Sequence, residues 1–173
     1  MNETSFAQYN LREELLLALN QKGFTTPTPV QEQVLSLDRF DQDLIVRAKT
    51  GSGKTLAFLL PLLQEIEPST SWPRILVLSP TRELAQQTAK EAEWISRHLD
   101  ISVATLVGGL DMSAQVRSLR AGAAIVVGTP GRTLDHINRS SLRTEGITSV
   151  ILDEGDHMLD MGFREELEGI LDS

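Results

Sequence analysis

The 173-residue chain contains no cysteine, and this absence removes two classes of site. Disulfides are excluded, and so are metal sites built from thiolates, so nothing in the chain depends on an oxidising compartment. Histidine is also scarce: the three histidines, at positions 98, 136 and 157, lack the spacing of metal ligands. We therefore expect each histidine to be a surface or packing residue, and we expect no metal site made from protein groups alone.

Long hydrophobic runs and an excess of positive charge are missing as well. No stretch approaches the length of a membrane span, and residues 1–5 have neither the basic segment nor the apolar run of a signal peptide. We expect a cytoplasmic protein with no membrane partner. Sixteen basic against 24 acidic residues give a net charge of −8, which argues against a strong, nonspecific electrostatic grip on nucleic acid. Any contact with RNA or DNA must be local.

The length suits one domain, and the hydrophobic pattern predicts a single α/β unit. Short apolar runs predict five buried strands, at 44–46, 74–79, 102–107, 123–127 and 149–152. Helical patterns predict helices at 11–19, after Pro29, at 56–63, from about 80 to 99, at 112–119 and at 167–171. The predicted loose loop is 68–73.

Residues 48–55, Ala-Lys-Thr-Gly-Ser-Gly-Lys-Thr, follow the first predicted strand and lead into a helix. The glycines let the loop backbone turn successive amide groups toward one point, where the helix N-terminus adds positive potential. Lys54 can reach the β and γ phosphates of a nucleotide, and the Thr55 hydroxyl can bind a phosphate-bound Mg²⁺. The stretch departs from the P-loop pattern once, at Ala48. We favour a nucleoside triphosphate site over a glycine-rich turn that merely joins a strand to a helix.

Acidic residues follow the last predicted strand, in the sequence Asp153-Glu154-Gly155-Asp156. An apolar strand that ends in an acid is how P-loop proteins bring a carboxylate to the Mg²⁺ of a bound nucleotide. Glu154 could orient or deprotonate the attacking water. An exposed acidic turn is the weaker reading of these residues.

Three other strand ends carry residues suited to a ligand. Thr81 and Arg82 stand where a strand gives way to a helix, and there they could hold a backbone phosphate or serve only as a cap and a surface charge. Gly108-Gly109 and the stretch from 128 to 132 follow two further strands. Because open α/β sheets bind ligands at the carboxyl ends of their strands, we expect these turns to share a ligand surface.

Taken in order, these stretches resemble the first RecA-like domain of a DEAD-box ATP-dependent RNA helicase. The resemblance runs from Phe6 to about Leu171 and depends on the order and spacing of its motifs. GFTTPTPVQ resembles the family's Q motif, AKTGSGKT motif I, PTRELA motif Ia, GG and TPGR the next RNA-contact motifs, and DEGD motif II. It implies a RecA-like P-loop NTPase fold, with a mainly parallel sheet between helices on both faces.

The resemblance also implies a role for each matching residue. Phe6 packs on adenine, Gln31 hydrogen-bonds the edge of the base, and Phe24 belongs to the same nucleotide site. Phosphates are held by Thr50, Gly51, Ser52, Gly53, Lys54 and Thr55. Thr55 and Asp153 hold Mg²⁺, partly through water, and the catalytic set is Lys54, Asp153 and Glu154. The sugar-phosphate backbone of RNA is contacted by Pro80, Thr81, Arg82, Gly109, Thr129, Gly131 and Arg132.

Two departures from the family pattern qualify these expectations. Gly155 replaces the alanine of DEAD, but both carboxylates of the motif are kept. The chain also ends before the family's Ser-Ala-Thr motif III and lacks the second RecA-like domain. We therefore expect residues 1–173 to be an N-terminal helicase ATP-binding domain, truncated before motif III, with 1–31 as its Q-motif region and with a monomeric state.

The expected function is binding of ATP and RNA, as part of a full-length enzyme that couples ATP hydrolysis to local unwinding of RNA. A non-catalytic, nucleotide-dependent RNA-binding module is the alternative. A P-loop kinase for small molecules is disfavoured, because no phosphate-acceptor lid is apparent.

By itself, the fragment is expected to bind nucleotide weakly and neither hydrolyse ATP appreciably nor unwind RNA. The arginine finger that such chemistry commonly uses is not placed in this chain, and in the resembling family the second domain supplies it. The family's motif III strand normally lies between the P-loop strand and the motif II strand. We therefore expect five parallel strands, in which 44–48 and 149–153 are not hydrogen-bonded to each other.

Overall fold

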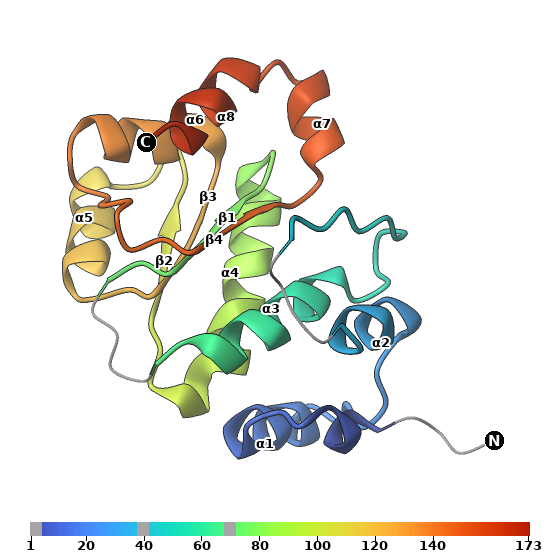
Figure 1. Cartoon of the computed structure of the whole chain (residues 1–173). Coiled ribbons are helices and arrows are strands. Elements are labelled where there is room, and N and C mark those ends of the chain that lie inside the picture. The colour runs from blue at the N-terminus through green and yellow to red at the C-terminus, as the bar shows by residue number, and fades with distance from the viewer. Residues whose placement is uncertain (1–4, 38–41, 68–71) are drawn as a thin grey trace.

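The computed structural model describes residues 5–37, 42–67 and 72–173 (Figure 1). Residues 1–4 of the N-terminal segment considered above, and residues 68–71 of the predicted loop at 68–73, lie outside this description. In the described part of the chain, no helix is both long and apolar enough to cross a membrane.

Four parallel strands form one sheet in the order β2-β3-β1-β4. They are β1 (Ile75–Leu78), β2 (Val103–Leu106), β3 (Ile125–Gly128) and β4 (Ser149–Leu152). The strands end at the same level, since Leu78, the last residue of β1, pairs with Gly128 on one side and with Leu152 on the other. All four carboxyl ends therefore meet at one edge of the sheet.

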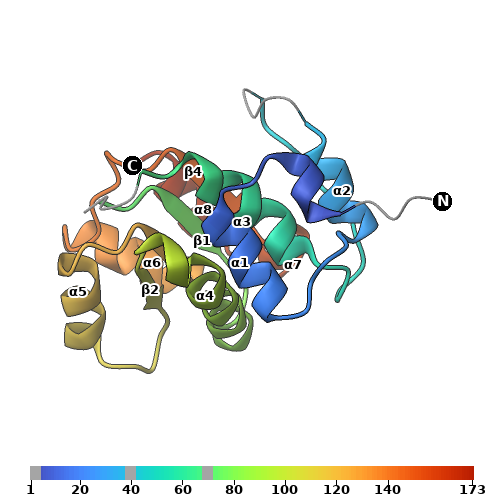
Figure 2. The same ribbon diagram turned by 90° about the horizontal axis from the view of Figure 1, so that it is seen from below.

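Helices cover both faces of the sheet (Figure 1). On one side lie α1 (Glu13–Gln21), α3 (Lys54–Glu65) and α4 (Arg82–Ser96), and Figure 2 shows α1 beside α3 and α4. On the other side lie α5 (Met112–Arg120), α6 (Pro130–Asn138) and α8 (Arg164–Leu171). Helix α2 (Pro29–Leu35) packs on α3, and α7 (Gly155–Asp160) follows β4. Two short 3₁₀ helices are η1 (Phe6–Tyr9) and η2 (Arg97–Leu99).

The two central strands, β1 and β3, are apolar and fully buried, because both of their faces pack against helices. In β1, Ile75 and Val77 belong to the core shared with α1, α3 and α4. Leu76 and Leu78 point to the other side and join a second core with residues of α5 and α8. The predicted fold class, a mainly parallel sheet between two helical layers, is confirmed.

The prediction of five strands is wrong at 44–46, where the structure contains no strand. Leu44, Ile45 and Val46 are 46%, 90% and 44% exposed, although they form an apolar run. The physical reason is the lack of a neighbour: in the described residues, β4 pairs only with β1, and an extended segment without a hydrogen-bonded partner is not stable in water. The expected lack of pairing between 44–48 and 149–153 is confirmed in the described part of the chain.

Two helices near the strand ends were not predicted. Helix α6 begins at Pro130, directly after Thr129, where the sequence analysis saw only a glycine turn. Proline at the first helical position supplies the required φ and needs no hydrogen-bond partner. Helix α7 begins at Gly155, inside the acidic stretch.

Candidate functional site

The four strand ends place the candidate residues at one edge of the molecule. Pro80 and Thr81 follow β1, Gly108 follows β2, Thr129 follows β3 and Asp153 follows β4. The Thr81 hydroxyl accepts a hydrogen bond from the backbone N–H of Leu84 (3.2 Å) and so caps α4. The predicted convergence of these turns on one edge is confirmed by the register of the sheet.

The loop at 50–53 has the backbone of a phosphate nest. Gly51 and Gly53 have φ values of 77° and 89°, in the left-handed region that favours glycine, and Gly53 leads directly into α3. Lys54 Nζ donates to the backbone carbonyl of Ala48 (2.9 Å). An ammonium group has three donors, so Lys54 keeps two for a ligand while it holds the loop.

Gln31 ties α2 to this loop. Its Nε2 donates to the carbonyl of Gly53 (3.1 Å), and its Oε1 accepts from the backbone N–H of Thr28 (2.9 Å). A Cβ at position 53 would collide with the Gln31 amide, so glycine is required there for space as well as for φ. Gln31 is only 4% exposed, yet its amide keeps one N–H and one lone pair unused.

The loop residues fit a polyphosphate with its divalent cation. The Oγ of Ser52 is buried and has no hydrogen-bond partner among the described residues. Such an orphaned hydroxyl next to a nest of backbone amides is suited to an anion. Thr55, at the second position of α3, adds a hydroxyl of the kind that binds Mg²⁺.

The two carboxylates after β4 are in different local environments. Burial, and then the neighbouring charge of Glu154, raise the pKa of Asp153, while the Lys54 ammonium partly opposes that shift. Lys54 and Asp153, which are far apart in the sequence, therefore lie within electrostatic reach of each other. Glu154 has a φ of 55°, which is uncommon for a residue other than glycine and marks a strained turn. Its Oε2 lies 3.3 Å from Nδ1 of His157.

Glu91 belongs to this group, although the sequence analysis did not identify it. Burial raises the pKa of Glu91, hydrogen bonding to Thr55 and Gln87 lowers it, and the nearby Asp153 raises it further. The packing of α4 against α3 brings Glu91 to this place. Within the sequence, a glutamate in a helix with many polar residues carries no signal of such a position.

The two candidate aromatic residues of the adenine site differ in exposure. Phe6 is 3% exposed and belongs to the main core, whereas Phe24 is 45% exposed. The backbone N–H of Phe6 donates to the carbonyl of Thr25 (3.3 Å), so the two segments are joined. The ring of Phe24 lies 6.0 Å from the ring of Trp94, measured between centroids.

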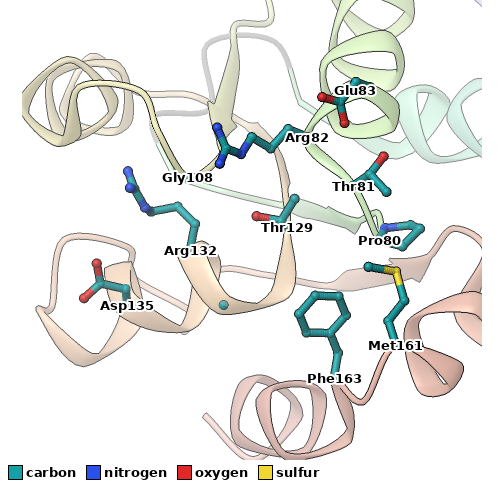
Figure 3. A pocket seen from close by; sticks show the side chains of 11 residues that line it. Pro80, Thr81, Arg82, Glu83, Gly108, Thr129, Arg132, Asp135, Met161 and Phe163 are labelled. Atoms are coloured by element: carbon teal, nitrogen blue, oxygen red, sulfur yellow. The ribbon is translucent and has the colours of Figure 1, made fainter.

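A surface pocket of about 430 Å³ lies between the turns that follow β1, β2 and β3 (Figure 3). Its lining residues are Pro80, Thr81, Arg82, Glu83, Gly108, Thr129, Gly131, Arg132, Asp135, Met161 and Phe163. The structure therefore gathers six of the seven residues predicted to contact RNA. The seventh, Gly109, is adjacent, because a Cβ at this position would collide with the Arg82 guanidinium.

The pocket has a charged side, where Arg82 and Arg132 lie with the acidic Glu83 and Asp135, and an apolar side. In Figure 3 the guanidinium groups of Arg82 and Arg132 approach Gly108 from two directions. Arg132 Nη1 also donates to the carbonyl of Leu110 (3.3 Å). Met161 and Phe163, in the segment after α7, form the apolar side, and no role had been assigned to them from the sequence.

Gly155, the departure from the DEAD pattern, has room for a side chain. A Cβ at this position would meet Leu152 Cβ at 3.4 Å, an ordinary van der Waals contact. Among the described residues, no three His, Cys, Asp or Glu side chains gather in a way that could hold a metal ion.

Comparisons with known proteins agree with this geometry. The family profile described as DEAD/DEAH box helicase matches residues 28–173. The ATP-dependent RNA helicase DeaD of Escherichia coli (strain K12) is 46% identical over 170 residues, and the ATP-dependent RNA helicase CshA of Listeria monocytogenes is 43% identical over 168. These alignments cover 98% and 97% of this chain but 27% and 32% of the relatives. The chain thus spans about a quarter to a third of the length of these proteins.

Solved structures share the fold over nearly the whole chain. A DEAD box protein from the hyperthermophile Methanococcus jannaschii matches with a TM-score of 0.86 at 42% identity, covering 97% of this chain and 46% of that one. A variant of S. cerevisiae Dbp5 bound to RNA and ADP BeF3 matches with a TM-score of 0.87 at 30% identity, covering 98% of this chain and 43% of that one.

Proposed function

The chain belongs to the DEAD/DEAH box helicase family, and from this premise we propose that it is the ATP- and RNA-binding N-terminal RecA-like domain of an RNA helicase. In this proposal the full-length protein couples ATP hydrolysis to local unwinding of RNA. One observation carries the proposal: Asp153, which interacts electrostatically with Lys54 of the loop at 50–55, lies at the same sheet edge as the pocket between Arg82 and Arg132. A nucleotide site and a nucleic-acid site thus share one rigid sheet.

The proposed nucleotide site uses the groups gathered around the loop. Lys54 and the backbone amides of 51–55 bind the phosphates, and Thr55 and Asp153 hold Mg²⁺, partly through water. The ion, when bound, stabilises the charge that develops on the transferring phosphoryl group. Glu154 orients the attacking water and accepts its proton. Its strained backbone sets the direction of its carboxylate.

For the base, we assign the edge of adenine to Gln31. We assign the open aromatic face to Phe24 in place of Phe6, which the resemblance places on adenine but whose ring is buried in the core. The unused N–H and lone pair of Gln31 match the N7 and N6 positions of adenine, and the contact with Gly53 can be kept at the same time. Phe6 supports this site from the core, because its ring is buried and its backbone holds Thr25.

For RNA, we propose that the pocket binds the sugar-phosphate backbone. Arg82, Arg132 and the N-terminal ends of α4 and α6 supply positive potential to one small region of a chain with net charge −8. Contacts of this kind hold a strand without reading its sequence.

The second RecA-like domain of the full-length protein then completes the site. We expect this domain alone to bind nucleotide weakly and to show no appreciable hydrolysis, because the arginine finger that phosphoryl transfer commonly uses is assigned in this proposal to the second domain.

Nucleotide titration of the domain tests the proposal. We expect ATP to bind more tightly than GTP, and Gln31→Ala to weaken ATP binding about tenfold, the effect of about two lost hydrogen bonds. Since the Gln31 contact with Gly53 serves every nucleotide, the ratio of ATP to GTP affinity isolates the contact with the base. Gln33→Ala, an exposed change on the same helix, is the matched control and should leave the ratio unchanged. Equal affinity of the unmodified domain for ATP and GTP would refute the assignment.

A further inference from the structure

A buried hydrogen-bond network links the turn after β2 to the turn after β3. We propose that Gln115 and His136 are positioning residues that hold these two turns at a fixed spacing for binding of the RNA backbone. The inference rests on the proposed function, because it concerns the RNA pocket. Neither residue lines that pocket, so both act through the turns that they connect.

The backbone carbonyl of Val107 determines which groups of the network donate a hydrogen bond and which accept one. Gln115 Nε2 donates to the carbonyl of Val107 (3.0 Å), at the end of β2. The Oε1 of the same amide therefore faces His136 Nε2 (3.1 Å), and His136 must donate through Nε2. On the other side of the ring, Nδ1 lies 2.8 Å from Ser141 Oγ. Ser141 Oγ also donates to the carbonyl of His136 (3.0 Å). The network therefore requires a proton on Nε2 of His136.

Each end of the network belongs to one turn of the pocket. Val107 directly precedes Gly108, and Gln115 lies on α5, which packs on β2. His136 lies on α6, which begins directly after Thr129 and carries Gly131 and Arg132. Helices α5 and α6 pack on different elements, because α5 packs on β2 whereas α6 packs on α8. A link between Gln115 and His136 is therefore a link between Gly108 and Arg132.

Because Gln115 and His136 are buried, the hydrogen bond between them has fixed partners. His136 is 0% exposed and Gln115 is 5% exposed, so neither side chain can exchange its partner for water without opening the fold. An apolar pair would fill the same volume but would impose no direction, whereas hydrogen bonds fix both distance and orientation. On the surface, Arg132 Nη1 reaches Leu110 O at a longer distance (3.3 Å) and spans the same two turns. The two turns are thus connected both by the buried network and by this surface contact.

Affinity measurements on the full-length protein test the inference. Gln115→Met keeps the size of the side chain and removes both of its hydrogen bonds, and His136→Leu removes the partner. We expect each to weaken binding of a single-stranded RNA about fivefold to tenfold while ATP affinity stays within about twofold. His136→Gln can still place an N–H near Gln115 Oε1, so RNA affinity should recover to within about twofold. Ser141→Ala, at a partly exposed position, should weaken RNA binding less than either of these.

The salt dependence separates positioning from general destabilisation. If one turn moves away from the strand, a phosphate contact is lost, and the slope of log affinity against log salt concentration falls by about one. Loss of ATP and RNA affinity in equal proportion would overturn the inference, and so would full RNA affinity in Gln115→Met and His136→Leu. Failure of the unmodified full-length protein to bind RNA would instead overturn the proposed function, and the inference with it.

Discussion

Single residues in unusual conformations shape the nucleotide site. Gly53 combines a φ of 89° with close contact to the Gln31 amide, and Glu154 adopts a φ of 55° at the start of α7. Backbone conformations of this kind cost free energy and persist where the surrounding structure enforces them. Both residues belong to the nucleotide site that we propose.

At the scale of single residues, the buried position of His136 leads us to predict that the stability of the domain depends on pH. Burial, and then the positive charges of Arg132 and Arg139, lower the pKa of His136, while Asp135 partly opposes the shift. In the unfolded chain the pKa returns to about 6.5. Between the two values the unfolded chain binds more protons than the folded protein. The contribution of His136 to the free energy of unfolding therefore decreases as the pH falls below about 6.5, and this loss continues down to the lowered pKa.

Urea unfolding of the domain between about pH 5 and 8 measures this effect. His136→Gln should flatten the decrease on the acid side, because glutamine does not titrate. His98→Gln, at a position outside the buried network, is the matched control and should retain the decrease. An acid-side decrease in the His136→Gln variant as steep as in the unmodified domain would show that other groups cause it.

At the scale of elements, pairing decides which apolar segments become strands. Residues 75–78 and 44–46 have similar composition, but β1 lies between β3 and β4, whereas 44–46 has no strand partner in the described part of the chain. Hydrophobic sequence alone does not reveal whether a neighbour exists. In the described part of the chain β4 pairs only with β1, and its Val150 and Leu152 are about 40% exposed although both are apolar.

Hydrogen exchange of the domain should show this difference directly. The backbone amides of 44–46 should exchange at nearly the rate of an unstructured peptide, because these residues are exposed and belong to no sheet. The amides of β1 should be protected by a free energy close to that of global unfolding. Comparable protection in both segments would mean that 44–46 is held in a sheet, contrary to the structure.

At the scale of the whole molecule, the predictable features were those that follow from a periodic pattern of residues along the chain. The four paired strands, the helices α1, α3, α4, α5 and α8, and the convergence of the strand ends follow from periodicity and from the rules of parallel sheets. The loop at 50–55 could be identified because its glycines, Lys54 and Thr55 occur together. Glu91, Met161 and Phe163 could not, since only the packing of distant elements brings them to the edge. The same holds for the pair Gln115 and His136.

The arrangement of the whole molecule also explains why activity is expected only in a longer protein. Both proposed sites lie at the edge of the sheet where the parallel strands end. Phosphoryl transfer needs positive charge at the transition state, commonly from an arginine worth about 10³–10⁵ in rate. We propose that this group comes from the second domain of the full-length protein.

RNA-stimulated release of phosphate from ATP by the full-length protein tests this account most directly. We predict that RNA increases the rate. We also predict that Glu154→Gln abolishes release while ATP affinity is retained, because an amide of similar shape cannot accept the proton of the water. Hydrolysis by Glu154→Gln at the normal rate would contradict the role of Glu154. Binding of ATP and RNA without any phosphate release by the unmodified full-length protein would contradict the central claim and leave a non-catalytic, nucleotide-dependent RNA-binding module.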